Sequence, residues 1–225
     1  MSKKPKNSTC NPPVYKINPD SPDASVIREA ARVIHAGGLV VFPTRTLYGL
    51  GVDANNPEAI GRLFQIKRRS AAKPVSILVK SRDALTSFVA EVPEAAIPIM
   101  DRFWPGRITL VFRAKEGIST LLTAGTGKIG VRIPEHPVAV QLVACLDCPL
   151  TGTSANYSGA PGVSRIEDLP RDFLNQMDLI LDAGRLNGGT GSTVIDMTTD
   201  PPQILREGAV SKKELVSGVI NMVDK

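Results

Sequence analysis

The chain has 225 residues, of which 42% are apolar, 22% charged and 4% aromatic, a composition typical of a globular protein rather than a disordered or fibrous one. Its apolar runs, such as Leu39–Phe42 and Ile108–Phe112, are far shorter than the roughly 20 residues that a membrane-spanning helix needs. The 27 Lys and Arg residues exceed the 22 Asp and Glu residues, so the formal charge of +5 favours anionic partners such as nucleotides, RNA or acidic proteins.

Residues 1–15 are basic and polar, and they end near Pro12-Pro13. They contain neither the apolar stretch of a secretion signal nor the Arg residues of a transit peptide. We therefore expect a cytoplasmic protein with a flexible basic leader over 1–15 and one domain over 16–225.

The first half of the domain predicts alternating helices and buried strands. Ser21-Pro22 precedes an apolar stripe at helical spacing that ends at Gly37-Gly38, and Leu39–Phe42 follows as a strand buried on both faces. A second helix is expected from Asn56-Pro57 to about Ile66, and Val75–Val79 is the next buried strand. The segment from Ser81 to Trp104 predicts two helices with a break near Pro93.

The second half continues the alternation. Two capping patterns mark helix starts: Ser164 with Glu167 begins a helix ending near Gln176, and Ser211 with Glu214 begins a last short helix. The other expected elements are strands Ile108–Phe112, Lys128–Ile133, Pro149–Thr153, Asp178–Leu181, Thr193–Met197 and Gln203–Leu205, and a helix from Pro137 to Leu146. Strands mixed with helices throughout predict a single α/β domain with a central mixed sheet.

Three cysteines cannot pair completely. Cys10 lies in the leader, and Cys145 with Cys148 forms a CxxC motif that has no second ligand pair at zinc-site spacing. We expect two reduced, partly buried thiols and no metal ion held by protein side chains.

Common catalytic signatures are missing from the sequence. It contains no phosphate-binding loop motif, no dinucleotide fingerprint, no H-E-x-x-H and no G-x-S-x-G. Its two histidines, His35 and His136, are expected at the surface or at helix caps. An enzyme with this sequence would act by binding and orienting polar reactants.

Four polar loops lie at the ends of predicted strands, where open α/β sheets bind ligands: Pro43–Gly51, Lys67–Pro74, Thr151–Gly159 and Gly188–Thr193. The second loop has four cations within seven residues, which suits a triphosphate. Each loop also fits a structural interpretation, either an ordinary turn or a solvated basic helix end. The loops alone leave both interpretations open.

From about Lys16 to Val219 the chain resembles the YrdC-like L-threonylcarbamoyladenylate synthases. The resemblance rests on FPTRTLYGLG, Lys67-Arg68-Arg69, FWPGRITLVF, IGVRIPEHP, TSANYSG, GSTVID and ILREGAV, which occur in the order and spacing of that family. It implies a twisted open α/β sheet with a positively charged concave face. It also implies synthesis of threonylcarbamoyl-AMP and pyrophosphate from ATP, L-threonine and bicarbonate, with Mg²⁺ carried mainly by ATP.

The resemblance implies three sets of site residues. They are Lys67, Arg69, Ser154 and Asn156 as catalytic residues, Thr44, Arg132 and Gly152 on L-threonine, and Lys67, Ser154, Gly162, Ser192 and Arg206 on ATP. The chain departs from the family pattern at Arg45 and Gly191, where an acidic residue is usual. The implied partners are a separate threonylcarbamoyl-transferase complex that modifies tRNA, and tRNA or RNA in contact with the basic face.

Two other functions remain open at this point. A non-catalytic RNA-binding module would suit the charge, although aromatic residues for base stacking are scarce. A carbamoyl-transfer enzyme of the same fold is the other alternative, although such relatives are much longer chains.

Overall fold

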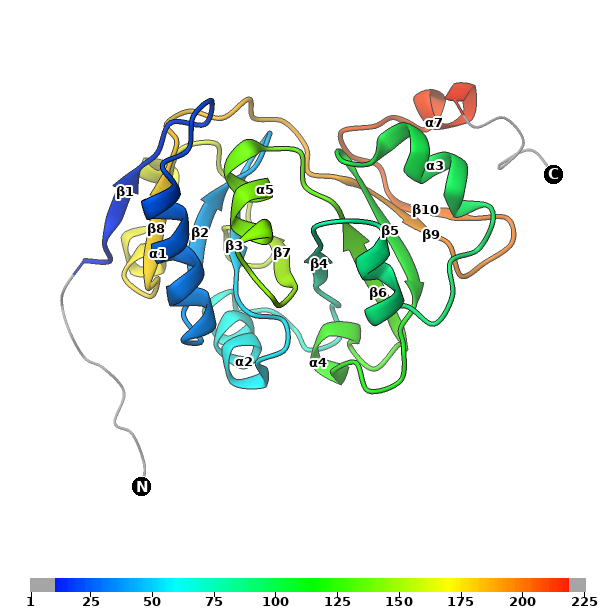
Figure 1. Ribbon diagram of the computed structural model, residues 1–225, viewed down its shortest axis with the longest axis horizontal. Coiled ribbons are helices and arrows are strands. Elements are labelled where there is room, and N and C mark those ends of the chain that lie inside the picture. Colours follow the sequence, from blue (N-terminus) through cyan, green and yellow to red (C-terminus); the bar gives the residue numbers. More distant parts are fainter. Residues whose placement is uncertain (1–10, 219–225) are drawn as a thin grey trace.

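A mixed sheet of ten strands runs through the computed structural model, which describes residues 11–218 (Figure 1). In chain order the elements are β1 (Val14–Lys16), α1 (Ala24–His35), β2 (Val40–Pro43), β3 (Tyr48–Gly51), α2 (Pro57–Ile66), β4 (Ser76–Leu78), the 3-10 helix η1 (Asp83–Ser87), α3 (Ala96–Phe103), β5 (Ile108–Arg113), α4 (Thr120–Thr123), β6 (Lys128–Arg132), α5 (Pro137–Ala144), β7 (Leu150–Ser154), the 3-10 helix η2 (Ile166–Asp168), α6 (Arg171–Leu174), β8 (Leu179–Asp182), β9 (Thr193–Asp196), β10 (Gln203–Arg206) and α7 (Lys212–Gly218).

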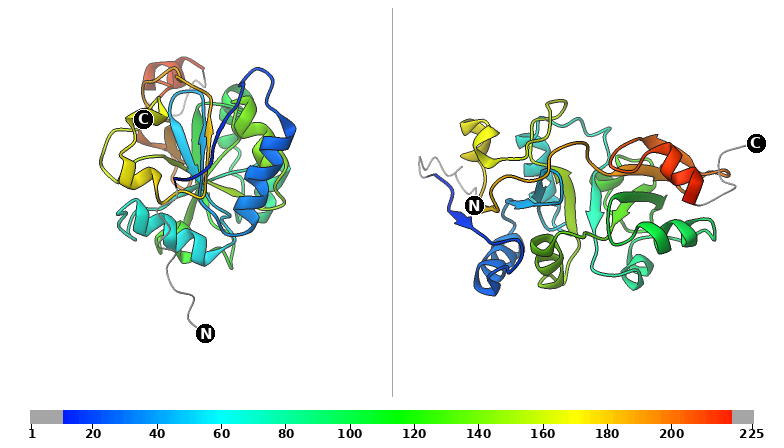
Figure 2. Two further views of the ribbon diagram at one scale, coloured as in Figure 1. Left: turned by 90° about the vertical axis from the view of Figure 1, so that its left-hand side faces the viewer. Right: turned by 90° about the horizontal axis from the view of Figure 1, so that it is seen from above.

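The strands lie in the order β1-β8-β2-β3-β7-β4-β6-β5-β9-β10, so β1 and β10 form opposite edges of an open sheet. Four neighbouring pairs are parallel, namely β1–β8, β2–β8, β4–β6 and β5–β9, and the other five are antiparallel. Helices flank the sheet, whose twist is visible along its length (Figure 2). The predicted single α/β domain with an open mixed sheet is confirmed.

Helices α1 and α5 lie side by side over one face of the sheet, where they cover β2 and β8 (Figures 1 and 2). The apolar stripe of α1 is buried there, as its helical spacing predicts. Ser21-Pro22 predicts Ser21 as the cap and Pro22 as the first helical residue, which is wrong by two residues. The side chain of Asp23 caps α1 by accepting the Ser25 N–H at 2.7 Å.

The predicted loop Pro43–Gly51 contains a strand that the sequence analysis missed. Its second half is β3, which pairs antiparallel with β2 and is fully buried. Gly49 and Gly51 look like loop residues in the sequence, but they serve close packing: a Cβ atom at Gly49 would lie 2.9 Å from the Phe42 ring. The Tyr48 hydroxyl fixes the strand further by donating to the Gly184 carbonyl oxygen at 2.7 Å.

Two predicted helical segments are shorter than expected. The helix expected from Ser164 to Gln176 is wrong, because the chain forms η2 and then the one-turn α6, separated by an extended Leu169-Pro170. The segment from Ser81 to Trp104 does break around Pro93, but its first part is the 3-10 helix η1. In contrast, the predicted cap of the last helix is confirmed, since the Glu214 N–H donates to Ser211 Oγ at 3.2 Å.

Strand β1 and helix α4 were not expected from the sequence. Val14 and Tyr15, assigned to the flexible leader, form part of β1 and pair in parallel with β8. Residues 1–10, including Cys10, lie outside the described residues.

Of the two predicted partly buried thiols, Cys145 is exposed and Cys148 is partly buried. Burial, followed by the nearby Asp53 carboxylate, raises the pKa of Cys148 to about 12.

Among residues 11–218, no helix combines the length and the apolar character needed to cross a bilayer.

Candidate active site

A strip of small residues crosses the middle strands of the sheet and forms the floor of the candidate site. Gly152 of β7 pairs with Ser76 of β4, whose hydroxyl donates to the Gly152 carbonyl oxygen at 2.7 Å. A Cβ atom at Gly152 would lie 2.9 Å from Leu78 Cδ2, and one at Gly130 of β6 would lie 3.2 Å from Ser76 Cβ. A larger residue at either position would therefore require its neighbours to shift, so glycine fits best here.

The period-two alternation of strands places polar residues on the same face as this floor. Ser154 lies two residues beyond Gly152 on β7, and Arg132 lies two residues beyond Gly130 on β6. Both side chains are half-buried. The structure thus brings Gly152, Ser154 and Arg132, three of the predicted site residues, to one face.

Lys67 is the C-cap residue of α2 and is only 1% exposed. Its Nζ atom donates to the main-chain oxygens of Ser154 and Asn156, the latter at 2.8 Å, and to Asn156 Oδ1 at 3.2 Å. These acceptors are uncharged, so they do not neutralise the ammonium group. Burial, with a smaller contribution from the nearby Arg69 guanidinium, lowers the pKa of Lys67 to about 7.

The loop after β7 is fixed to the end of α2 by further hydrogen bonds. Ser154 Oγ donates to Asn156 Oδ1 at 2.5 Å, and Asn156 Nδ2 donates to the Ala160 carbonyl oxygen. The Ser158 N–H donates to the Lys67 carbonyl oxygen at 2.7 Å. Lys67, Ser154 and Asn156 therefore form one cluster, which we call the lysine cluster.

A second cluster joins β10 to the segment before β9. The Arg206 guanidinium donates to the Ser192 carbonyl oxygen, at 2.7 Å from its terminal nitrogen, and lies 3.4 Å from Ser192 Oγ. The Ser192 hydroxyl also lies 2.8 Å from Thr109 Oγ1, on β5. Thr109 is a buried supporting residue that the sequence analysis missed, since a single threonine within a predicted strand gives no functional signal.

Three arginines connect these clusters through their charges. Burial lowers the pKa values of Arg69, Arg132 and Arg206, and the Arg206 charge lowers those of Arg69 and Arg132 further. The Arg69 side chain is oriented by the carbonyl oxygens of Lys73, at 3.1 Å, and Pro74, at 2.6 Å. Partly desolvated guanidinium groups that repel one another make a site in which a polyanion is favourable.

Thr44 and Gly162 both contact Leu47, and Gly162 also lies beside Ser154 of the lysine cluster. Thr44 Oγ1 donates to the Leu47 carbonyl oxygen at 2.6 Å, and a Cβ atom at Gly162 would lie 2.7 Å from Leu47 Cδ1. Gly162 would also have its Cβ 3.6 Å from Ser154 Cβ, which places it beside the loop after β7.

Arg45, one of the two residues that depart from the family pattern, has a partner in the structure. Arg45 forms an ion pair with Glu135 at 3.3 Å, and Glu135 in turn favours the charged form of Arg132. Sequence reasoning missed Glu135 because nothing in its local pattern indicates a partner far away in the chain. Its neighbour His136 is the N-cap residue of α5, but its side chain makes no capping bond and its Nδ1 atom is buried without a partner among the described residues.

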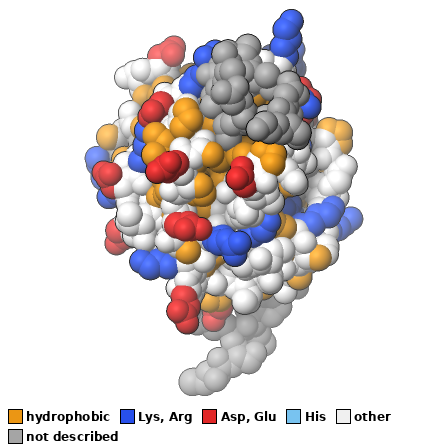
Figure 3. All heavy atoms as spheres, turned by 90° about the vertical axis from the view of Figure 1, so that its right-hand side faces the viewer, with side chains coloured by type: hydrophobic (Ala, Val, Ile, Leu, Met, Phe, Trp, Pro, Cys, Tyr) orange, Lys and Arg blue, Asp and Glu red, His pale blue; other side chains and the backbone are white. Residues whose placement is uncertain are grey.

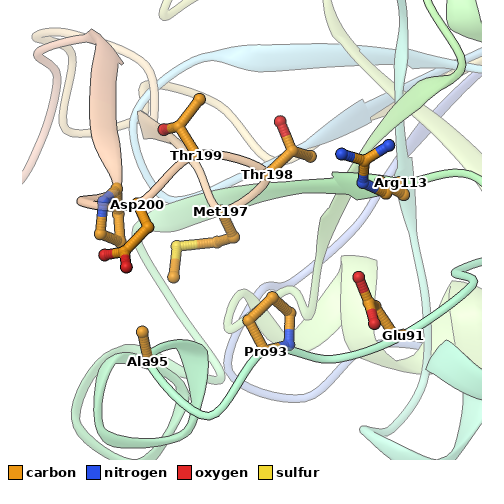
Figure 4. A pocket seen from close by; sticks show the side chains of 9 residues that line it. Glu91, Pro93, Ala95, Arg113, Met197, Thr198, Thr199 and Asp200 are labelled. Atoms are coloured by element: carbon orange, nitrogen blue, oxygen red, sulfur yellow. The ribbon is translucent and has the colours of Figure 1, made fainter.

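A separate pocket of about 360 Å³ contains none of these residues. It is lined by Glu91, Pro93, Ala95, Arg113, Met197, Thr198, Thr199, Asp200 and Pro202 (Figure 4). The pocket lies near the turn between β9 and β10. The uncovered part of the face at this end of the molecule mixes hydrophobic side chains with both signs of charge (Figure 3).

A protein-family model matches most of the chain. The Sua5/YciO/YrdC family model, described as "Telomere recombination", matches residues 32–208. The chain belongs to the Sua5/YciO/YrdC family. The matched range contains every predicted site residue, from Thr44 to Arg206.

Several relatives are named as threonylcarbamoyl-AMP synthases. The chain is 39% identical over 189 residues to a threonylcarbamoyl-AMP synthase of Pyrococcus abyssi, covering 84% of this chain and 56% of that protein. It is 35% identical to a putative threonylcarbamoyl-AMP synthase of Mycobacterium tuberculosis, covering 84% of this chain and 87% of that protein. The crystal structure of P. abyssi Sua5 complexed with L-threonine superposes with a TM-score of 0.88 at 36% identity, covering 93% of this chain and 61% of that one. The chain thus spans little more than half the length of the P. abyssi relative.

Proposed function

We propose that this Sua5/YciO/YrdC domain is an L-threonylcarbamoyladenylate synthase. The reaction joins L-threonine, bicarbonate and ATP into threonylcarbamoyl-AMP and releases pyrophosphate. The observation that carries the proposal is that four cationic groups lie close enough to repel one another. The Arg206 charge lowers the pKa values of Arg69 and Arg132, and the Arg69 charge lowers that of Lys67. The names of the relatives support this reaction for such a site.

Arg69, Arg206 and Lys67 are the proposed ligands of the ATP phosphates. Their pKa values are lowered by burial, so a bound triphosphate would restore the favourable environment that desolvation removes. Guanidinium forks bind phosphate oxygens in pairs, whereas the ammonium group supplies a point charge. Ser154, Ser192 and Gly162 complete the proposed ATP site, and Asn156 orients the ammonium group of Lys67.

The proposed threonine site lies on the floor of small residues. The Arg132 guanidinium would bind the threonine carboxylate, Thr44 would contact the substrate, and Gly152 would contact it through its backbone. The complex of P. abyssi Sua5 with L-threonine supports an amino-acid site in this fold. Arg132 is well placed for this role because its Nε atom donates to the Gly106 carbonyl oxygen at 2.6 Å, which fixes the side chain while leaving its terminal nitrogens for a ligand.

The chemistry needs no side-chain nucleophile. Bicarbonate takes up a proton and loses water to give CO2. The neutral amine of threonine then forms a bond to the carbon of CO2 and loses a proton to water, giving a carbamate. A carbamate oxygen then bonds to the α-phosphorus of ATP while the bond from that phosphorus to the β-bridging oxygen breaks, and pyrophosphate leaves. Arg69, Arg206 and Lys67 would stabilise the negative charge on the transferring group and on the leaving pyrophosphate.

Mg²⁺, which shields phosphate charge during such transfers, would be held by ATP oxygens and water. This assignment follows from the donor set: within the described part of the chain, the one group of three potential metal-binding side chains lies outside the candidate site. The product is a mixed anhydride that reacts with water. A separate threonylcarbamoyl-transferase complex would pass it to tRNA, and the basic face of this domain is the proposed point of contact with tRNA or RNA.

The test measures pyrophosphate release from ATP with Mg²⁺ and bicarbonate, with and without L-threonine. We expect release to require both threonine and bicarbonate, and we expect L-serine to react less well, because a lost methyl contact is worth about 1–3 kcal/mol. Release that is unchanged without threonine would contradict the proposal. An RNA-binding module would instead show salt-dependent RNA binding and no threonine-dependent turnover.

A further inference from the structure

Three side chains with metal-binding chemistry lie close together at the strand ends opposite the candidate active site. His35 is the last residue of α1, and Asp147 and Cys148 lie in the turn between α5 and β7 (Figure 1). Strands β2 and β7 both run antiparallel to β3 and so point the same way. The cluster lies before these two strands, whereas Thr44 and Ser154 lie at their far ends.

The distances within this cluster fit a divalent ion. One ligand atom from each residue lies within 4.8 Å of the others, and His35 Nε2 lies 3.5 Å from Asp147 Oδ1. Tetrahedral zinc has ligand bonds of about 2.0–2.3 Å, which places its ligand atoms about 3.3–3.7 Å apart. The side chains of His35 and Asp147 are 42% and 89% exposed, so they are free to move the remaining distance of about 1 Å.

The surroundings of Cys148 support the same conclusion. The Asp53 carboxylate lies close enough to interact with this thiol, and it is itself fixed by accepting the Asn55 N–H at 2.7 Å. Its negative charge favours a cation beside Cys148. Helices α1 and α5 both end beside the cluster, and the partial negative charge of a helix C-terminus favours a cation.

We propose that His35, Asp147 and Cys148 bind a zinc ion that joins the end of α1 to the turn before β7. A mixed set of imidazole, carboxylate and thiolate suits zinc better than Mg²⁺ or Ca²⁺, which take oxygen ligands. On binding, the Cys148 sulfur forms a bond to zinc and its proton passes to solvent. Water takes the fourth position. This site is independent of the proposed synthase activity.

The experiment uses the full chain, stripped of metal with a chelator and then titrated with ZnCl2 under reducing conditions. We expect one zinc per chain by calorimetry and elemental analysis, together with a higher Tm, because a ligand that binds only the folded state stabilises it. Replacing zinc with Co²⁺ should give a thiolate-to-cobalt absorption band. Cys148→Ser and His35→Gln should each weaken zinc binding at least tenfold and reduce the rise in Tm that zinc causes. Cys148→Ser should also remove the thiolate band.

Cys145→Ser is the matched control, because this second thiol of the CxxC motif is exposed and does not belong to the cluster. We expect it to bind zinc as the unchanged protein does. Loss of binding in Cys145→Ser would overturn the proposed ligand set in favour of the CxxC pair. Unchanged affinity in His35→Gln, or no saturable binding by the unchanged protein, would overturn the proposal as well.

Discussion

The Nζ atom of Lys67 lies 2.8 Å from the main-chain carbonyl oxygen of Asn156, within a cluster that contains no carboxylate partner for it. The ammonium group is almost completely buried, at 1% exposure of the residue. Burying a cation without a counter-charge is unfavourable unless a ligand supplies the charge. This pair of residues therefore marks where we expect the anionic end of the substrate.

The first prediction concerns Lys67→Met, which keeps much of the side-chain volume and removes the charge. We expect threonine-dependent pyrophosphate release to fall about 100-fold or more, the range seen when one group that stabilises transition-state charge is removed. The Tm should change by only a few degrees, because the substitution also removes a costly buried charge. Lys80→Met, at an exposed lysine after β4, is the control and should keep full activity. Equal activity in both variants would exclude Lys67 from the reaction.

The second prediction is a pH dependence of stability. The folded-state pKa of Lys67 is about 7, against 10.5 in a model peptide. Between these values the unfolded chain holds a proton that the folded chain has released, so the free energy of unfolding contributed by this group rises with pH. Urea unfolding at pH 6.5 and 9.5 should show a larger gain at high pH for the unchanged protein than for Lys67→Met. Identical gains in the two proteins would contradict the lowered pKa.

The third prediction concerns Arg206, which Ser192 holds beside the other two arginines. Arg206→Ala should lower kcat/KM for ATP about 10- to 100-fold, since a charge-assisted hydrogen bond contributes about 1.5–3 kcal/mol. Arg206→Lys should recover part of this loss, because it keeps the charge but not the fork of donors. Steady-state kinetics with ATP as the varied substrate provide the measurement. A KM for ATP that is unaltered in Arg206→Ala would place the phosphates elsewhere.

The fourth prediction separates a ligand contact at Ser154 from a purely structural turn. Ser154→Ala removes the hydroxyl that donates to Asn156 Oδ1 at 2.5 Å, and it should raise the KM for ATP more than the KM for threonine. Both KM values and the Tm are measured, with the exposed Ser25→Ala of α1 as control. A lower Tm together with an unchanged KM for ATP would refute the assignment of Ser154 to the ATP site.

The fifth prediction tests whether the Arg45–Glu135 ion pair protects the threonine site. Arg45 holds Glu135 at 3.3 Å, and Glu135 is close enough to Arg132 to influence its charge. Arg45→Glu should release Glu135 toward Arg132, where it competes with the substrate carboxylate, and should raise the KM for threonine several-fold. Adding Glu135→Gln should restore that KM, because the competing charge is gone. The single variant should have little effect on Tm, since exposed ion pairs contribute about 0–1 kcal/mol.

The sequence predicted the buried strands of the fold because continuous apolar runs such as Leu39–Phe42 have few alternatives. It missed β3 because Gly49 and Gly51 signal a turn unless the position of the Phe42 ring is known. It missed β1 because a three-residue strand with exposed side chains has no hydrophobic pattern. β1 is a strand because it pairs with β8, and that pairing between distant segments leaves no local pattern in the sequence.

The residues of the candidate site were predicted from the resemblance to the YrdC-like synthases, but their contacts were not. The resemblance assigned Lys67 and Ser154 to one site, and the structure places them in one cluster. The pairing of Arg45 with Glu135 and the support of Ser192 by Thr109 depend on strand order across the sheet. No local pattern in the sequence contains that strand order, so these two contacts could not be predicted from the sequence.

The spatial order of the strands also sets when the site can exist during protein synthesis. Strand β5 pairs with β9, and β9 pairs with β10, which ends at Arg206. A nascent chain that has emerged only as far as β7 contains Lys67 and Ser154 but has neither the edge strand nor its guanidinium group. Contacts between distant parts of a chain form slowly and late in folding. Substrate therefore cannot guide the early stages of folding on the ribosome, because it has a complete site to bind only after β10 has emerged.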